Sequence, residues 1–243
     1  MNNQQQMFLN LFGIDKMKIT ETVIMTPIFG INNWKGHVDF VIEEFKSKYY
    51  FSGINGAVNG ENITIIFSGQ GIQRVADCVY FLKNTKCKHI VYSGAAGGVG
   101  DVSIGDIIIS NRIYSHYNNF KSNIANLKSI SMKLNYNNLK ILKNFIEDNN
   151  IKEAPTASLA GFFQENKKSL DYLRKKNIKG IDFESFIFLK TAKKIGINPV
   201  ILNYIYDKPG EIGFYVDNNK LMNIRNIARE KIIKLSLNIA SKL

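Results

Sequence analysis

The fold is decided by two neighbouring stretches, HIVYSGAAGG at residues 89–98 and VSIGDIIIS at residues 102–110. Residues 89–92 predict a short strand that runs into a Gly-rich turn, and residues 104–110 predict the next strand. Such a turn lets the backbone approach a ligand closely. Neither this cluster nor Gly69-Gln70-Gly71 matches the dinucleotide fingerprint or has a phosphate-loop lysine, so each alone also fits an ordinary tight turn.

Strands and helices alternate on both sides of this stretch. The Asn59-Gly60 pair predicts a hairpin, because both residues tolerate positive φ. Strands are predicted at 22–26, 49–57, 62–68, 156–161, 178–182 and 199–206, and helices at 38–46, 72–82, 136–149, 167–176 and 218–243. The polar segment 114–135 is predicted to be a loop. This order favours an α/β fold with a parallel or mixed sheet covered by helices on both faces.

Length and composition favour one domain in the cytoplasm. The chain has 243 residues, of which 45% are hydrophobic, enough for one large core. Residues 1–17 are interpreted as a leader before a domain at 18–243. No apolar run reaches the ~18–20 residues that cross a membrane, and the polar start is unlike a signal peptide. Cys78 and Cys87 are too few for a disulfide framework or a zinc site and are interpreted as reduced thiols.

The net charge of +12 raises the question of a nucleic-acid partner. Only five of the 32 basic residues are arginine, and the lysines are spread from Lys16 to Lys242. This distribution favours a solvated basic surface over a face that binds a polyanion. We therefore expect neither nucleic acid nor a membrane as partner.

Read together, the motifs resemble a known family. The segments 92–98 and 102–110 resemble the G-[ST]-[AC]-G and V-G-D-I-V-V-[ST] motifs of the nucleoside phosphorylase and 5′-methylthioadenosine nucleosidase family. Downstream, residues 181–185 (IDFES) resemble its V-E-M-E-[AS] motif, and residues 205–207 (IYD) resemble I-S-D. The resemblance covers about residues 20–240. It implies a three-layer architecture whose central mixed sheet is partly barrel-like and flanked by helices.

The resemblance also implies roles for individual residues. Glu184 matches the glutamate that holds the ribose hydroxyls and offsets positive charge on the ring, and Phe183 replaces the neighbouring Met under the sugar. Asp207 matches the general acid that protonates purine N7. Phe162 stands where the family has an aromatic residue that stacks on the base. The Gly-rich segment is expected to supply three further substrate-binding residues, Gly94, Ala95 and Ala96.

Each of these residues also has a purely structural interpretation. Glu184 could complement the dipole at the start of a helix, and Asp207 could be a turn residue or an ion-pair partner. Phe162 could belong to the core. His116 is interpreted as a loop residue, and the histidines show no metal-ligand spacing.

The departures from the family bear on the nucleophile. The resemblance implies that phosphorylases hold phosphate with arginines after the first strand and before the Gly-rich turn, and with a Ser or Thr inside that turn. The first loop here, residues 26–30 (TPIFG), has no Arg, and Tyr92 and Ala95 occupy the other two positions. A buried phosphate without cationic partners would be costly, which favours water as the nucleophile. The nucleosidase branch uses a Glu in the first loop, and none lies between Thr26 and Asn33.

Three functions therefore stay open. The first is a nucleosidase that cleaves the N-glycosidic bond of a purine nucleoside or a 5′-modified adenosine with water. The others are a phosphorylase with a rearranged phosphate site and a non-catalytic nucleoside-binding paralogue. No cofactor or metal is expected. The resemblance implies a homo-oligomer, and the apolar leader residues Met7, Phe8, Leu9, Leu11 and Phe12 favour packing on the core or across a two-fold interface.

Overall fold

The computed structural model describes residues 3–116, 121–124, 129–134, 145–147, 149, 151–216 and 218–243. Within these ranges the chain forms two compact units. Unit 1 comprises Met1–Gly94, Ile187–Val200 and Ile233–Leu243, and unit 2 comprises Ala95–Phe186 and Ile201–Ile232. Strands β5 (His89–Gly98) and β10 (Asn198–Asp207) and helices α6 (Ser185–Ile195) and α7 (Asn219–Ala240) each supply residues to both units.

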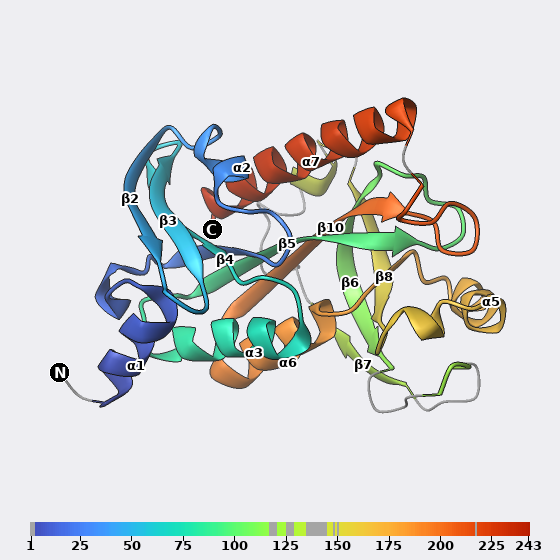
Figure 1. Ribbon diagram of the computed structural model, residues 1–243, viewed down its shortest axis with the longest axis horizontal. Helices are drawn as coiled ribbons and strands as arrows, with labels where there is room; N and C mark the ends of the chain where they lie inside the picture. The colour runs from blue at the N-terminus through green and yellow to red at the C-terminus, as the bar shows by residue number, and fades with distance from the viewer. Residues whose placement is uncertain are drawn as a thin grey trace. The chain divides into compact units, whose positions relative to one another are not determined.

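Unit 1 is built on mixed strands (Figure 1). Strand β1 pairs in parallel with β4 and β5, and β3 pairs antiparallel with β2 and β4. The remaining elements of unit 1 are α1 (Asn3–Phe12), η1 (Lys16–Lys18), β1 (Thr22–Thr26), α2 (Asn32–Lys35), β2 (Phe40–Lys46), β3 (Ser52–Val58), β4 (Glu61–Phe67), α3 (Ile72–Phe81) and η2 (Leu82–Asn84). The β3–β4 turn has φ 53° at Asn59 and 82° at Gly60, which confirms the predicted hairpin.

The leader forms helix α1 and packs on unit 1. Phe8 and Phe12 are buried, and the Phe12 ring centroid lies 4.8 Å from that of Phe51. The Phe51 N–H donates to the Leu11 carbonyl at 3.1 Å. These contacts account for the apolar face of the leader within one chain, and assembly into an oligomer stays a prediction.

The strand order of the sheet includes the run β10-β6-β8-β9-β5, and β10 also pairs with β5, which partly closes the sheet into a barrel. Pairs β6–β8 and β8–β9 are parallel, whereas β10–β6 and β5–β9 are antiparallel. The remaining elements of unit 2 are β6 (Ile107–Ser115), β7 (Ile130–Lys133), β8 (Lys152–Ser158), η3 (Phe162–Gln164), α5 (Lys167–Lys175) and β9 (Gly180–Asp182). The expected α/β class with a mixed, partly barrel-like sheet is confirmed.

Two secondary-structure predictions are wrong. Residues 38–46, predicted as a helix, contain strand β2, which pairs antiparallel with β3. Their apolar spacing fits either structure, but the Phe45 ring occupies the space beside Gly53, where a methyl group would lie 2.2 Å from Phe45 Cζ. Residues 94–98, predicted as a turn, continue strand β5 and pair with β9 at Gly97 and Gly98.

The segment predicted as a loop at 114–135 is described only in part. This prediction is also wrong at residues 114–115 and 130–133, because strand β6 extends to Ser115 and residues 130–133 form β7, which pairs with it. Residues 145–147 of the predicted helix at 136–149 are helical. The rest of that helix, apart from Asn149, and residues 117–120, 125–128 and 135 lie outside the described residues. In the described part of the chain, no helix is both long and apolar enough to cross a bilayer.

Candidate active site

Asp207 ends strand β10 in unit 2 and is 7% exposed. Burial raises the pKa of its carboxyl group to about 6, while the charge of Arg225 and the backbone N–H groups of Asp207 and Phe214 act in the opposite direction. A methyl group on Gly97 would lie 3.1 Å from Asp207 Oδ1 and 2.8 Å from the Pro209 ring. The glycine therefore leaves the acid a close-fitting space beside β5.

Arg225 on α7 fixes the loop that follows Asp207. It is 3% exposed, and its Nε and Nη1 donate to the carbonyls of Tyr206 at 2.9 Å and Val216 at 3.0 Å. The guanidinium also lies 4.2 Å from the centroid of the Tyr206 ring, which suits a cation–π contact. One buried cation thus holds both ends of the loop and keeps a positive charge near Asp207.

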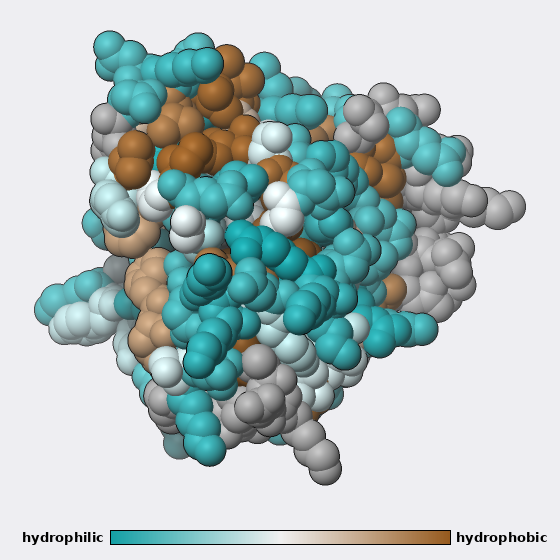
Figure 2. All heavy atoms as spheres, turned by 90° about the vertical axis from the view of Figure 1, so that its right-hand side faces the viewer, coloured by the Kyte–Doolittle hydropathy of each residue, from teal (hydrophilic) through white to brown (hydrophobic). Residues whose placement is uncertain are grey.

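Three aromatic rings meet in unit 2. The Phe162 ring centroid lies 4.8 Å from Phe183 in an edge-on contact and 5.2 Å from Phe214 in a stacked contact. Phe162 is 58% exposed, so the structure places it at the surface and not in the core. Figure 2 views the right-hand side of Figure 1 and shows hydrophobic side chains gathered among hydrophilic ones on that face. The exposed face of Phe162 suits stacking on a flat ring.

Glu184 lies between β9 and α6 and is half-buried. Its neighbour Asp182 accepts from Ser158 Oγ at 2.6 Å, Ser185 Oγ at 2.9 Å and Ser185 N at 3.2 Å. Burial, aided by the charge of Glu184, raises the pKa of Asp182 to about 7 against these hydrogen bonds. Asp182 therefore anchors the start of α6 through its hydrogen bonds to Ser185. Glu184 lies between these two residues in the sequence, so its backbone is held in place.

Glu165 is a second half-buried acid in this part of unit 2. Burial, and then the negative charge of Asp207, raise the pKa of its carboxyl group to about 7. Glu165 was not predicted from the sequence, because it belongs to none of the motifs. Arg225 was missed for the same reason: it is one arginine on an amphipathic helix, and only folding places it beside Asp207.

The predicted residues of the Gly-rich segment divide between two faces of β5. The Ala96 side chain is buried in the core with Val102, Ile108, Ala154 and Ile205, so only its backbone is available to a ligand. Ala95 is half-buried, as is Gly97, which faces Asp207. Gly94 precedes them on the same strand and is the last residue of this segment in unit 1. Unit 2 thus supplies every other predicted site residue.

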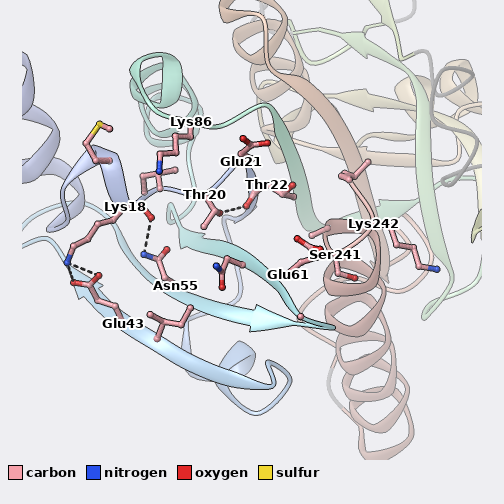
Figure 3. Close-up of a pocket in the computed structure, with 17 residues that line it drawn as sticks. Lys18, Thr20, Glu21, Thr22, Glu43, Asn55, Glu61, Lys86, Ser241 and Lys242 are labelled. Atoms are coloured by element: carbon pink, nitrogen blue, oxygen red, sulfur yellow. Dashed lines mark hydrogen bonds and ion pairs between the residues drawn. The ribbon is translucent and has the colours of Figure 1, made fainter.

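A pocket of about 950 Å³ lies within unit 1 and includes none of the predicted residues. Figure 3 shows its polar lining, in which Lys18 pairs with Glu43 at 2.8 Å and Asn55 Nδ2 donates to the Lys18 carbonyl. Thr22 and Glu61, which start β1 and β4, also line it. Ligands of α/β sheets bind at the opposite, carboxyl ends of strands, so this pocket is not the candidate active site.

The cysteines and histidines of the described chain do not add a second site. Cys78 and Cys87 are both buried, and burial raises the pKa of Cys78 above its ordinary value and that of Cys87 to about 12. His116, expected in a loop, is buried at the end of β6, and burial lowers its pKa. Among the described residues, no three His, Cys, Asp or Glu side chains gather in a way that could hold a metal.

A family model described as "Phosphorylase superfamily" matches residues 35–240, which is most of the chain. The protein belongs to the phosphorylase superfamily. Its fold is similar to that of uridine phosphorylase from Vibrio fischeri, with a TM-score of 0.75 and 19% identity over 95% of each chain. No curated protein matches the chain by sequence.

Two further structures show the same superfamily fold. The purine nucleoside phosphorylase of Toxoplasma gondii has a TM-score of 0.75 and 15% identity, over 94% of this chain and 93% of that one. The 5′-methylthioadenosine/S-adenosylhomocysteine nucleosidase of Campylobacter jejuni has a TM-score of 0.74 and 13% identity, over 92% and 99%. At these identities the likeness establishes the fold alone.

Proposed function

We propose that this superfamily member cleaves the N-glycosidic bond of a purine nucleoside or a 5′-modified adenosine, with water as the nucleophile. The observation that carries the proposal is the buried Asp207 at the end of β10, whose pKa of about 6 lies close to neutrality. An acid with such a pKa is still partly protonated near neutral pH and yet gives up its proton readily. Similar chains include both nucleosidases and nucleoside phosphorylases.

Asp207 would act on the leaving group. A purine leaves poorly as an anion, and protonation at N7 turns it into a neutral leaving group. The Asp207 carboxyl group is suited to this, because burial favours its neutral, proton-donating form while Arg225 stabilises the carboxylate that remains after transfer.

Glu184 would act on the sugar. When the glycosidic bond breaks, positive charge develops on the ribose ring, and a nearby carboxylate stabilises it. Its two oxygens can also accept hydrogen bonds from the 2′- and 3′-hydroxyl groups. The anchoring of Asp182 by Ser158 and Ser185 keeps the adjoining Glu184 at the start of α6.

The placement of three of the five arginines supports water over phosphate. Arg225 is buried and donates to the Tyr206 and Val216 carbonyls, and Arg174 pairs with Asp171 and Glu211. Arg74 of unit 1 donates to the Ser68 carbonyl at 2.7 Å and to the Tyr50 carbonyl. Phosphate recognition normally needs arginine or a nest of N–H groups, and these three arginines already have other partners.

Two observations bear on the alternative functions, a phosphorylase and a non-catalytic nucleoside-binding paralogue. Tyr92, at a position where the resemblance implies an arginine for phosphorylases, is buried against Phe188 at 5.1 Å between ring centroids, so a phosphorylase would need a rearranged phosphate site. The loop Thr26–Asn33 has no glutamate to orient water, and Phe29 and Ile31 in it are buried. This second feature favours a nucleoside-binding paralogue if no turnover is found.

The test is release of free base from adenosine, 5′-methylthioadenosine, inosine and uridine, with and without inorganic phosphate. We expect release from a purine substrate at a rate independent of phosphate, with the free sugar as the other product: ribose, or 5-methylthioribose from 5′-methylthioadenosine. A rate that saturates with phosphate, accompanied by ribose 1-phosphate, would establish a phosphorylase instead. Binding of purine nucleosides without any product would favour the paralogue, and cleavage of uridine alone would contradict the purine assignment.

A further inference from the structure

We propose that the pocket of unit 1 binds a small zwitterion, namely an α-amino acid with an aliphatic side chain. The pocket has a volume of about 950 Å³, within the range of about 300–1,000 Å³ that is usual for sites of small molecules. Its lining residues all belong to unit 1. None of the residues assigned to nucleoside cleavage lines it, so the inference goes beyond the proposed function.

Buried hydrogen bonds hold one wall of the pocket in place. Asn55 on β3 is 6% exposed, and its Oδ1 accepts from Thr64 Oγ1 at 2.7 Å while its Nδ2 donates to the Lys18 carbonyl at 3.2 Å. The backbone N–H groups of Thr20 and Thr64 each donate to the hydroxyl oxygen of the other, at 3.0 Å and 2.8 Å. An amide nitrogen carries two protons, and the bond to Lys18 uses one of them. Asn55 thus offers a fixed N–H donor to a ligand.

The charged side chains that line the pocket, among the described residues, balance one another. Three are acidic and three are basic: Glu21, Glu43, Glu61, Lys18, Lys86 and Lys242. Lys18 and Glu43 form an ion pair at 2.8 Å, and Glu21 pairs with Lys88 at 2.8 Å. A ligand with a net charge would upset this balance, because like charges brought together repel. The lining therefore favours a ligand whose own charges sum to zero.

Glu61 and Lys86 lie on opposite sides of the start of β1. Strands β4 and β5 flank β1, with Ile63 and His89 opposite Thr22. Neighbouring strands are about 4.8 Å apart, so the two flanking strands are about 10 Å apart. Glu61 begins β4 and Lys86 shortly precedes β5, and in the view of Figure 3 Thr22 lies between them. A small molecule above Thr22 is therefore within reach of both side chains.

The charged groups of Glu61 and Lys86 are both available to a ligand. They are exposed, and within the described part of the chain neither has a hydrogen bond or an ion pair. The pKa of Glu21 is lowered chiefly by its hydrogen bond to Lys88 and only slightly by the charge of Lys86. The Glu61 carboxylate can accept from a ligand ammonium group, and the Lys86 ammonium group can donate to a ligand carboxylate. This pairing is the one that a free amino acid offers.

The pocket also has an apolar part. Met17 and Ile42 line it, and these large apolar side chains are 58% and 53% exposed. An aliphatic group that covers them would remove apolar surface from water, which is favourable. This feature favours amino acids such as leucine or valine over glycine.

The first experiment is a calorimetric titration of the full chain with L-leucine, for which we expect saturable binding. Two analogues of leucine each lack one charge, since 4-methylpentanoate has no ammonium group and 3-methylbutylamine has no carboxylate. Each should bind about tenfold more weakly, because it loses one charge-assisted hydrogen bond. Glycine should also bind more weakly, because it covers no apolar surface. No saturable binding up to about 10 mM leucine, or equal affinity for leucine and any of these three compounds, would overturn the proposal.

The second experiment repeats these titrations on Glu61→Gln and Lys86→Gln. Glu61→Gln should weaken the binding of leucine about tenfold but leave that of 4-methylpentanoate unchanged, because this analogue has no ammonium group for Glu61 to bind. Lys86→Gln should weaken leucine by a similar factor and leave 3-methylbutylamine unchanged. Unchanged leucine affinity in both variants, or an equal loss for leucine and both analogues, would overturn the assignment.

Lys83→Gln and Glu44→Gln are the matched controls. Lys83 lies in η2, three positions before Lys86, and Glu44 lies on β2, and both are exposed and absent from the lining. The affinity for leucine should not change in either variant, and unfolding temperatures without ligand check that all four variants fold. A loss equal to that in Glu61→Gln or Lys86→Gln would show a general effect of surface charge and would overturn the site. Binding is measured without turnover, so failure of this proposal and failure of the proposed cleavage are distinguishable.

Discussion

Asp182 and Asp207 each end a strand of unit 2, and their exposed fractions are nearly equal, at 6% and 7%. Burial raises the pKa of both, to about 7 and about 6. They differ in their donors: Asp182 accepts from the hydroxyl groups of Ser158 and Ser185, whereas the hydrogen bonds described at Asp207 come from the backbone. Burial and a raised pKa are thus common to both acids. The donors around each acid separate a structural carboxylate from one that can act on a ligand.

The largest expected effect is the contrast between Asp207→Asn and Asp182→Asn. Loss of a general acid typically costs about 10²–10⁴-fold in rate, so Asp207→Asn should lower kcat/KM for unactivated purine nucleosides by that factor. Asp182→Asn should stay within a few-fold of wild type. Steady-state rates measure both, with unfolding temperatures as the control for folding. Nucleosides with activated leaving groups should lose less kcat/KM in Asp207→Asn. Equal losses of kcat/KM for activated and unactivated nucleosides would show that Asp207 is not the general acid.

Next in size is Glu184→Gln. Hydrogen bonds to a charged group contribute about 1.5–3 kcal/mol, so ribosides should lose roughly 10–100-fold in kcat/KM. The loss for 2′-deoxyribosides should be smaller, because they lack one of the hydroxyl groups. Parallel measurements on adenosine and 2′-deoxyadenosine give the answer. Identical losses of kcat/KM for the two nucleosides would show that Glu184 stabilises the start of α6, as Asp182 does, and does not bind the ribose.

A smaller effect is expected for Gly97→Ala. The new methyl group would lie 3.1 Å from Asp207 Oδ1 and 2.8 Å from Pro209, so the acid must shift by a few tenths of an ångström. We expect kcat/KM to fall by roughly tenfold, since small misplacements of a catalytic group are costly. Gly100→Ala is the contrasting variant in the same region. No atom lies within 4 Å of its added methyl group, so the strain that it introduces comes from the backbone φ of 76° and not from a contact with another residue. Full activity of Gly97→Ala would show that Asp207 does not need this fit.

The last prediction concerns stability and not rate, namely the dependence of stability on pH. The pKa of Asp182 is about 7 in the folded protein and 3.8 as its ordinary value, so the folded state binds the proton more tightly. The contribution of Asp182 to stability is fully present below pH 4 and is lost as the pH rises towards 7. Asp182→Asn should therefore flatten the fall in unfolding temperature between pH 4 and pH 7. Thermal unfolding across this range tests it, and a slope equal to that of wild type would contradict the assignment.

The sequence predicted much of the order of elements, because the decisive patterns were local. Asn59-Gly60 requires only positive φ at two positions, and the structure shows 53° and 82° there. The strand at Thr22–Thr26 was predicted with its observed bounds, since it is an uninterrupted buried run. The failures at β2 and at residues 94–98 have a common cause. In both, pairing with another strand decided the conformation against the local signal: β2 pairs with β3, the next strand along the chain, and residues 97–98 pair with the distant β9.

The candidate site was predictable only where a residue belongs to a motif. Asp207 and Glu184 were proposed in this way, and the structure adds what the motifs could not show: the burial of Asp207 and the hydrogen bonds of Asp182 at the start of α6. Glu165 and Arg225 were not found, because their importance depends on tertiary neighbours. Glu165 matters through the charge of Asp207, which is 42 positions away in the sequence. Arg225 matters through two carbonyl groups at the ends of a loop.

The attachment of that loop at both ends by Arg225 has a consequence for how the protein can be altered. The carbonyl groups of Tyr206 and Val216 both accept from the Arg225 guanidinium group. The two ends of the loop between them are therefore held at a fixed separation. Side-chain changes at Glu211, Ile212 and Tyr215 should leave Asp207 where it is, whereas the backbone at Phe214 must keep its place because its N–H group donates to the Asp207 carboxyl group. Exchange of these side chains is thus a route to new substrates that does not disturb the acid.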